Sequence, residues 1–200
     1  MIRIMRKTSN QRTAAKEASH ERIVEVAARA IRRSGYDGTG VADIMKEAGL
    51  THGAFYAHFA SREAMLAEAA DRAGAQSNAA TAAAVASVAP QQAMETLIRS
   101  YLSTTHLDAT EAGCPIAALV SEMPRQSPEV RRVATRRIKE SIDLIAQQSS
   151  DWGQAAAHER ALVIAATLVG SLALARAVDE PALAERLREA SIQHLLTLAR

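Results

Sequence analysis

Hydroxyl, imidazole and phenol groups gather in one short stretch, residues 51–58, with the sequence THGAFYAH. Phe55 and Phe59 are four residues apart, so a helix here turns both rings, together with Leu50, towards a core. The other side chains then point outward: Thr51, His52, Gly53, Tyr56 and His58. Such a surface packs poorly against protein, but its groups can contact phosphates and base edges. The stretch therefore predicts a nucleic-acid-binding surface.

The residues before this stretch must position it. Residues 41–47 read as a short helix with Ile44 and Met45 on its apolar side. Gly49 can take a left-handed backbone at the corner that follows. Thr51 then stands at the N-cap of the next helix, where its hydroxyl can accept a hydrogen bond from a free backbone N–H. Two short helices around a glycine turn indicate a helix-turn-helix, which places its second helix in the major groove of DNA.

Residues 20–66 resemble the DNA-binding domain of TetR-family transcriptional repressors. The matching text is ERIVEVAARAIRRSGYDGTGVADI, followed by MKEAGLTHGAFYAHFASREAML. Its pattern A-G-L-T-x-G-x-F-Y-x-H-F is more specific than a general helix-turn-helix. The later segments GCPIAALVSEM and SPEVRR resemble the ligand-binding half of one branch of that family. The resemblance implies a ligand-responsive repressor that binds a palindromic, double-stranded DNA operator as a homodimer.

The resemblance also assigns roles to single residues. Seven positions are candidates for DNA binding: Thr39, Thr51, His52, Gly53, Tyr56, His58 and Arg62. The last three and Thr39 are expected to hold phosphates, whereas the middle three approach bases, with Gly53 allowing close contact. Thr39 is also expected to cap the helix that starts near Val41. The family usually has a second Ser or Thr after it that helps to hold a phosphate; here Gly40 leaves this contact to Thr39 and backbone N–H groups. For Arg62, a solvated surface arginine remains an alternative.

Composition favours a helical protein with two functional parts. Of the 200 residues, 48% are hydrophobic and 3% aromatic, and long stretches are rich in Ala, Leu, Glu and Arg. We therefore expect an all-α fold. An N-terminal three-helix helix-turn-helix DNA-binding domain would span residues 20–66, and a C-terminal helical bundle for ligand binding and dimerisation would span residues 67–200. Residues 1–66 carry eleven Lys and Arg against seven Asp and Glu, so the positive field lies on the DNA-binding half.

The first nineteen residues are a basic segment with two interpretations. Residues 1–19 hold one acidic side chain and five basic ones: Arg3, Arg6, Lys7, Arg12 and Lys16. They are either an arm that follows the DNA backbone or enters a minor groove, or a disordered tail. A helix over residues 21–34, stopped by Gly35, is expected to follow.

The C-terminal half contains one unusually apolar helix. Ser127 is predicted to cap a helix start, as Ser61 does earlier in the chain. Residues 161–178 are apolar almost all round, but Arg160 and Arg176 bracket a stretch shorter than the about 20 residues that a membrane span needs. We expect a helix that is buried on both sides and that, with the last helix, forms a dimer interface as half of a four-helix bundle. No membrane contact is expected.

A ligand pocket is expected inside the bundle. Its candidate lining residues are Met94, Ile98, Tyr101, Cys114, Ala118, Trp152 and Leu168. Few aromatic residues and no obvious buried charge predict a small, largely apolar inducer. The inducer would favour a conformation in which the two recognition helices no longer match the spacing of the operator half-sites.

The sequence has no motif for catalysis or for binding a metal or cofactor, so an enzyme is not expected. The single cysteine, Cys114, excludes an internal disulfide and, with an N-terminus unlike a secretory signal, predicts a cytoplasmic protein. Cys114 directly precedes Pro115 at a helix start, where a thiol can be activated. A second hypothesis is therefore a helical small-molecule or redox sensor with incidental DNA binding. The alternative for Cys114 is a small apolar residue that lines the bundle.

Overall fold

The computed structural model describes the backbone of residues 2–199 and the side chains of residues 11–199. This part of the chain is helical and contains no strand, which confirms the all-α fold class. The N-terminal part consists of α1 (Ile2–Ser34), α2 (Val41–Glu47), the 3-10 helix η1 (His52–Ala57) and α3 (Arg62–Ala86). The bundle consists of α4 (Pro90–Tyr101), α5 (Thr104–Asp108), α6 (Pro115–Leu119), η2 (Met123–Arg125), α7 (Pro128–Ala146), α8 (Ala155–Ala177) and α9 (Pro181–Leu198).

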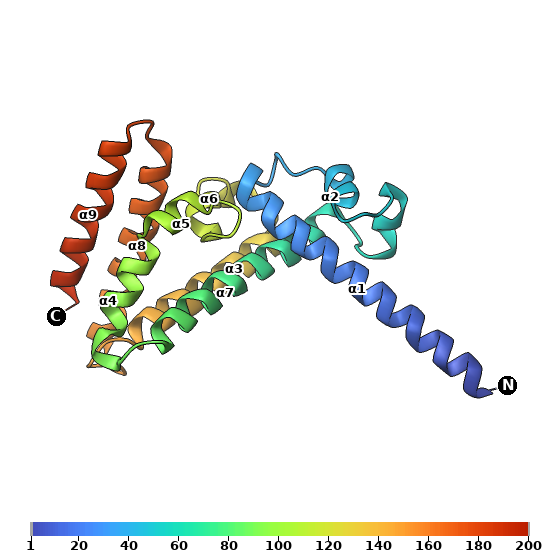
Figure 1. Ribbon diagram of the computed structural model, residues 1–200, viewed down its shortest axis with the longest axis horizontal. Helices are drawn as coiled ribbons and strands as arrows, with labels where there is room; N and C mark the ends of the chain where they lie inside the picture. Colours follow the sequence, from blue (N-terminus) through green and yellow to red (C-terminus); the bar gives the residue numbers. More distant parts are fainter. Residues whose placement is uncertain (1, 200) are drawn as a thin grey trace.

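The molecule is elongated, with the helix-turn-helix and α9 at opposite ends (Figure 1). α3 and α7 run side by side through its middle. Because α3 also packs on α1, this one helix contributes to both halves of the molecule. It crosses the boundary expected between residues 66 and 67, so the two halves share a continuous rigid element. The boundary itself stays a prediction.

Several predicted helix ends are confirmed by their local hydrogen bonds. Ser61 accepts a hydrogen bond from the N–H of Ala64 at 3.1 Å, and Ser127 accepts one from Val130 at 3.4 Å. Gly49 adopts a left-handed φ of 73° at the helix-turn-helix corner, where a side chain would be strained. These three residues therefore set where α3 and α7 begin and where α2 ends.

Other helix ends differ from the expectation. α1 begins at Ile2 and not near residue 21, so the basic segment continues the helix, and α1 projects away from the folded body (Figure 1). At α2, Gly40 occupies the N-cap and no side chain caps the helix, so the predicted Thr39 cap is wrong. Thr51 does stand at the N-cap of η1, but its hydroxyl accepts no capping hydrogen bond.

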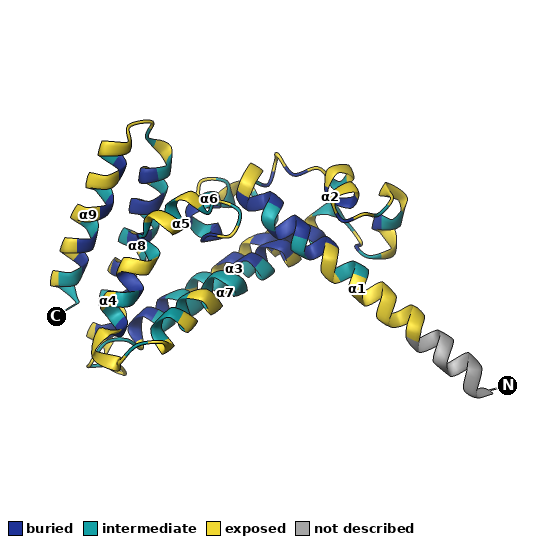
Figure 2. Cartoon of the chain, viewed as in Figure 1, coloured by how far each residue is buried: buried dark blue, intermediate teal, exposed yellow. Residues whose placement is uncertain are grey.

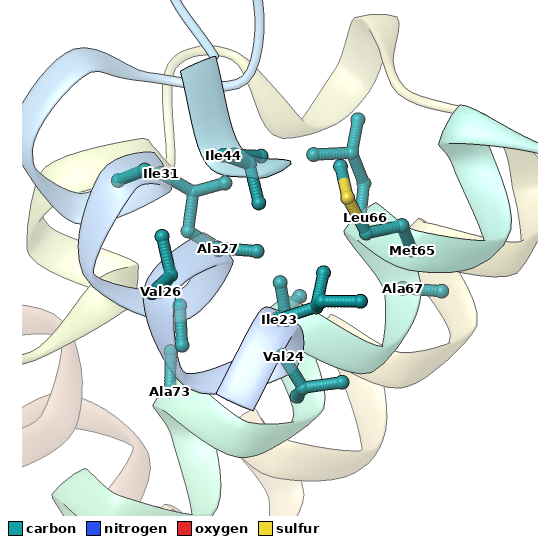
Figure 3. Close-up of a cluster of buried hydrophobic side chains, with 14 of the residues drawn as sticks. Ile23, Val24, Val26, Ala27, Ile31, Ile44, Met65, Leu66, Ala67 and Ala73 are labelled. Atoms are coloured by element: carbon teal, nitrogen blue, oxygen red, sulfur yellow. The ribbon is translucent and has the colours of Figure 1, made fainter. Parts of the chain in front are cut away.

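Three helices, α1, α2 and α3, meet in the part of the N-terminal core drawn in Figure 3. Ile23 and Ile31 of α1 are fully buried, and they meet Ile44 of α2 and the first turns of α3. Met65 and Leu66 close this cluster from α3. Burying a side chain of this size stabilises the fold by about 1.5–3 kcal/mol. The core thus holds α2 against α1 and sets the position of the segment that follows.

The apolar helix α8 is not buried on both sides, which corrects the expectation from sequence. Leu162, Val163 and Leu174 are 45%, 51% and 56% exposed, respectively. α9 covers only one side of α8, where the hydroxyls of Ser171 and Ser191 hydrogen-bond at 2.7 Å. Figure 2 shows the buried positions of α9 on the side that faces α8. By length and composition alone α8 is apolar enough to cross a membrane, which a core helix of a helical bundle can also be.

Candidate DNA-contact surface and interior cavity

Four of the seven predicted DNA-binding residues share one exposed surface. Thr51, His52, Gly53 and Tyr56 are all exposed, and Tyr56 is 73% exposed although it is a large aromatic residue. Phe55 anchors the inner side of η1: its ring is buried and stacks on the ring of Phe59, with the ring centroids 5.5 Å apart. η1 is a 3-10 helix and not an α-helix, but the division into an inner and an outer face is as the spacing predicts.

Arg22 and two other arginines of α1 hold the helix-turn-helix in place. The Arg22 Nε donates to the carbonyl of Ala48 at 3.0 Å, at the corner between α2 and η1. Arg29 and Arg33 both pair with Glu47, at 3.5 and 3.4 Å. These α1 arginines are therefore engaged within the protein. Sequence reasoning did not assign them to this role, because their partners lie on another helix.

Thr39 does not lie on the exposed surface, contrary to the expectation. Its side chain is 3% exposed, and its hydroxyl donates to the carbonyl of Gly35 at 2.6 Å. The only hydroxyl proton is thus used inside the protein, so Thr39 cannot donate it to a phosphate. Thr39 instead closes the turn between α1 and α2.

Arg62 is partly buried and is bound to the same turn. Its Nη2 donates to the carbonyls of Tyr36 and, at 3.2 Å, Thr39. The predicted alternative of a freely solvated arginine is therefore wrong. Arg62 links the start of α3 to the loop before α2, so it positions the helix-turn-helix whether or not it also meets DNA.

His58 is half-buried instead of pointing outward. Its Nδ1 is buried and has no hydrogen-bond partner among the described residues, and its ring lies 5.9 Å from that of His20 on α1. Burial lowers the pKa of His58, and the nearby charges of His20 and Lys16 lower it further. A neutral, partly covered imidazole is a weak phosphate ligand, so His58 differs from its predicted role.

Gly53 is an unusual glycine, because the fold does not require one there. Its φ is not among the positive values, which occur at Gly35, Gly49 and Gly153. A Cβ built on Gly53 would meet no atom within 4 Å. Neither backbone strain nor crowding inside the protein therefore explains the missing side chain. Open space lies where a side chain would stand.

A cavity of about 400 Å³ lies in the bundle between α3, α4, α6, α7 and α8. Three of the seven predicted pocket residues line it: Tyr101, Cys114 and Leu168. Sequence reasoning missed the other lining residues, which come mainly from α3, α7 and α8. They include Ile138, Ile142, Ile145, Ser77, Asn78 and Thr81. The apolar stripe of α7 marked it as core-facing, but its pattern could not distinguish a filled core from a cavity wall.

The other four predicted pocket residues do not line the cavity. Ile98 is fully buried in the packed core of the bundle, and Met94 packs against the same core. Ala118 packs against the core of the N-terminal part. Trp152 is 52% exposed in the turn between α7 and α8. These four assignments are wrong because side chains that share an interior face need not border the same empty space.

The bundle also contains buried charge, contrary to the prediction. Arg188 of α9 is 7% exposed, and Arg32 of α1, which reaches the bundle at the carbonyl of Gly113, is 5% exposed. Arg176 is partly buried and donates through Nη2 to the carbonyl of His106 at 2.6 Å and through Nε to that of Leu107 at 3.1 Å. The ring of His106 meets that of the cavity residue Tyr101 at 4.8 Å. A cationic group therefore lies next to the cavity. Within the described residues, no three possible metal ligands lie together.

Both halves of the chain match the models of known protein families. Residues 23–69 match the family model of bacterial regulatory proteins of the tetR family. Residues 90–191 match the C-terminal domain of LmrA/YxaF-like transcriptional regulators. An uncharacterized HTH-type transcriptional regulator of Mycobacterium tuberculosis is 32% identical over 169 residues, which cover 80% of this chain and 85% of that protein. The chain belongs to the TetR family.

Solved structures show the same fold as this TetR-family chain. A TetR regulator of Chloroflexus aurantiacus is 26% identical, with a TM-score of 0.76, and covers 92% of this chain and 95% of its own. The reduced form of Escherichia coli NemR has a TM-score of 0.76 at 18% identity, over 90% of this chain and 96% of its own. The protein is thus a transcriptional regulator with a DNA-binding helix-turn-helix, and its relatives are regulators and not enzymes.

In this TetR-family chain, one segment connects the cavity with the DNA-binding domain. The segment of residues 113–122 contains Cys114, which lines the cavity. The buried Arg32 of α1 donates to the carbonyl of Gly113 at 3.3 Å and to the amide oxygen of Gln76 at 2.6 Å. At the other end, the backbone N–H of Tyr36 donates to Glu122 at 2.8 Å. The cavity wall therefore contacts the loop that precedes α2.

Proposed function

We propose that the protein is a ligand-responsive transcriptional repressor that binds a palindromic operator as a homodimer and releases it when a small, largely apolar molecule occupies the cavity. The observation that carries the proposal is the shared segment of residues 113–122, which borders the cavity and bonds to the DNA-binding domain. The family assignment supports the DNA-binding part, and the cavity supports the ligand response.

For the operator complex, we propose base contacts from η1. Thr51, His52 and Gly53 would approach base edges in the major groove, and the open position of Gly53 lets the backbone come close. Tyr56 would donate to a phosphate from its exposed hydroxyl. Arg62 keeps a phosphate role through the guanidinium nitrogens other than Nη2, which makes the bonds to the turn. His58 would contribute packing against α1 more than charge.

A homodimer would cover the exposed apolar side of α8. Val163 and Leu174 are exposed there on one face of the helix, and an apolar patch at the surface of a soluble protein marks an interaction site. If α8 and α9 of two protomers pack together about a two-fold axis, the four helices form a bundle. The same axis would place the two η1 surfaces on one face of DNA. Two-fold symmetry would then require an inverted repeat in the operator. DNA binding of this kind takes place in the cytoplasm.

The ligand would act by preferring one conformation. Because segment 113–122 borders the cavity, a ligand that moves this segment also changes the contacts to Arg32 and Tyr36. Those contacts sit at the end of α1 and before α2, so they control the orientation of η1 relative to the bundle. Release follows if the ligand binds the reoriented form more tightly than the DNA-bound form.

A redox sensor is the second candidate function. The Cys114 thiol is buried, is not in a disulfide and lines the cavity, so a small oxidant or electrophile that enters the cavity would meet it. DNA binding would then be incidental to the sensing. The family assignment favours the repressor, since the helix-turn-helix is complete.

The proposal can be tested with a library of random double-stranded DNA. The purified full-length protein should enrich an inverted repeat, with half-sites about one helical turn or more apart. The variant His52→Ala, which leaves the buried side of η1 intact, should fail to enrich it. Enrichment of a single half-site would argue against the homodimer, and no enrichment of any sequence would contradict the repressor function.

A further inference from the structure

Two buried hydrogen-bond donors beside the cavity have no acceptor in the protein. Among the described residues, Arg176 Nη1 and the hydroxyl of Tyr101 are buried without a partner. The Tyr101 hydroxyl lies next to the Cys114 thiol, whose sulfur is at most a weak acceptor. Native proteins rarely leave buried donors unpaired, and each such group calls for an explanation. Here two lie in one neighbourhood.

The two donors belong to one cluster beside the cavity, although Arg176 itself is not among the residues that line it. Tyr101 lines the cavity directly. Arg176 lies two helical turns beyond the cavity residue Leu168 on α8, and the spacing of eight residues keeps both on one face of that helix. The Arg176 guanidinium donates to the carbonyl of His106, whose ring contacts Tyr101 edge to face. Along α8, apolar residues that line the cavity are thus followed by a cationic residue.

The charge of Arg176 is not compensated by the protein. No carboxylate forms a salt bridge with it in the described part of the chain, whereas the buried Arg188 pairs with Glu185. Two of its three nitrogens donate to neutral carbonyls, and these do not cancel a charge. Burial lowers the pKa of Arg176, and the same burial raises that of Tyr101. Removing a cation from water without an anionic partner is costly.

The nearest imidazole cannot provide the missing acceptor. The N–H of Cys114 donates to Nε2 of His106 at 2.9 Å, so the proton of this ring is on Nδ1, which donates to the carbonyl of Tyr101 at 2.6 Å. Both ring nitrogens are therefore used. Two other polar residues of the cavity wall bond to each other, since Ser141 donates to Asn78 at 2.6 Å. The contacts within the described residues therefore leave both donors without an oxygen or nitrogen acceptor.

We infer that the cavity binds a monocarboxylate with an apolar body, whose two oxygens accept hydrogen bonds from Arg176 Nη1 and the Tyr101 hydroxyl. This inference rests on the proposed ligand response and names its ligand class. A carboxylate supplies one negative charge and two acceptors, which match one guanidinium nitrogen and one phenol. A phosphate would bring further charge and oxygens for which the apolar walls offer no donors. The volume of about 400 Å³ suits a small ligand of this kind.

The inference can be tested on the full-length protein with matched acids and alcohols. The probes are octanoate and octan-1-ol, and 4-phenylbutyrate and 4-phenylbutan-1-ol, measured by isothermal titration calorimetry. The wild type should bind each acid about tenfold or more tightly than its alcohol, because hydrogen bonds to charged groups are the stronger ones. This comparison needs no variant, so it holds even where a substitution disturbs folding.

Two variants and a control locate the effect. Arg176→Gln should remove the preference for the acids, and Tyr101→Phe, which keeps the ring that lines the cavity, should reduce it. Arg131→Gln removes an exposed cation of α7 that has no ion-pair partner among the described residues, and should leave the preference unchanged. Equal binding of acid and alcohol by the wild type, or binding of none of the four probes, would overturn the inference. Stabilisation by sodium chloride alone, lost in Arg176→Gln, would also overturn it, since the donors would then hold an inorganic anion.

The same proteins should be tested for operator binding without a probe. Intact operator binding together with an absent acid preference would remove this inference and leave the repressor function standing. Loss of sequence-specific DNA binding by the wild type would instead contradict the proposed function itself. The two failures are therefore distinguishable.

Discussion

The backbone N–H of Tyr36 donates to the carboxylate of Glu122 at 2.8 Å, although 86 residues separate the two in the chain. Tyr36 is fully buried just after the DNA-binding domain's first helix, and Glu122 is the last residue of segment 113–122, which lines the cavity. This contact joins the two functional halves directly.

Replacing Glu122 should therefore lower the free energy of unfolding. Glu122→Ala leaves the buried N–H of Tyr36 without an acceptor, which costs about 1–3 kcal/mol of the free energy of unfolding. Glu122→Gln retains an amide oxygen as acceptor and should cost less. Urea unfolding measures both, with Glu159→Ala on the exposed side of α8 as the control. If the free energy of unfolding falls equally in all three variants, the contact between Tyr36 and Glu122 does not stabilise the fold more than an exposed side chain does.

Gly53→Ala should separate folding from DNA binding. The added methyl meets no atom within 4 Å and needs no positive φ, so the free energy of unfolding should stay the same or rise by about 0.4–1 kcal/mol. Operator affinity should fall by about tenfold or more, as for the loss of one base contact. Thermal unfolding and fluorescence anisotropy measure the two effects. Unchanged operator affinity would exclude close approach of this backbone to DNA.

Tyr56 and His52 should affect DNA binding in different ways. Tyr56→Ala removes a phosphate contact and should weaken operator and unrelated DNA by similar factors, with a shallower salt dependence. His52→Ala removes a base contact and should mainly reduce the preference for the operator. Affinities for both DNAs at several salt concentrations test this division. An equal loss of preference in the two variants would refute it.

Stability should fall in mild acid because of His106. Burial lowers the pKa of His106 in the folded protein below the 6.5 of the free side chain, and Arg176 lowers it further, against an opposing effect of the hydrogen bond to Tyr101. The unfolded chain then binds more protons, so stability is retained above about pH 6.5 and is lost as the pH falls below it. His106→Gln should flatten this dependence in urea unfolding at pH 7.5 and 5.5.

The exposed His194 gives the control for this measurement. His194→Gln should leave the pH dependence as in the wild type. Because the pKa of His58 is also lowered, a residual slope should remain in His106→Gln. A slope that is unchanged in His106→Gln would assign the acid sensitivity to other groups.

Cys114→Ser separates the repressor from the redox sensor. The serine hydroxyl preserves the size of the buried thiol approximately, but it is not oxidised by peroxide. Under the repressor hypothesis, operator affinity should be equal in the wild type and the variant, before and after peroxide treatment. Release of DNA by peroxide from the wild type alone would favour the sensor.

The helix-turn-helix could be predicted because its determinants are local. The spacing of Phe55 and Phe59, and the glycine at position 49, define the inner face and the corner within a few residues. Thr39 and His58 were placed wrongly because their surroundings are not local. The hydroxyl of Thr39 is taken up by the carbonyl of Gly35, and the ring of His58 is covered by α1.

The cavity was harder to predict than the fold. Periodicity shows which side chains face inward, and it correctly placed Ile98 inside the bundle. It cannot show which part of the interior stays unfilled, since this depends on how α7 and α8 meet. The contacts of the partly buried Arg176 were missed for a related reason: at the end of an apolar helix, an arginine normally extends into solvent.

The central claim is sequence-specific DNA binding by the η1 surface. It is tested most directly by measuring the affinity of the purified full-length protein for the DNA upstream of its own gene, against scrambled DNA of the same composition at physiological salt. We expect nanomolar binding with a preference of about a thousandfold, and loss of that preference in His52→Ala. Weak binding that does not depend on sequence, for this DNA and for every sequence selected from a random library, would contradict the account.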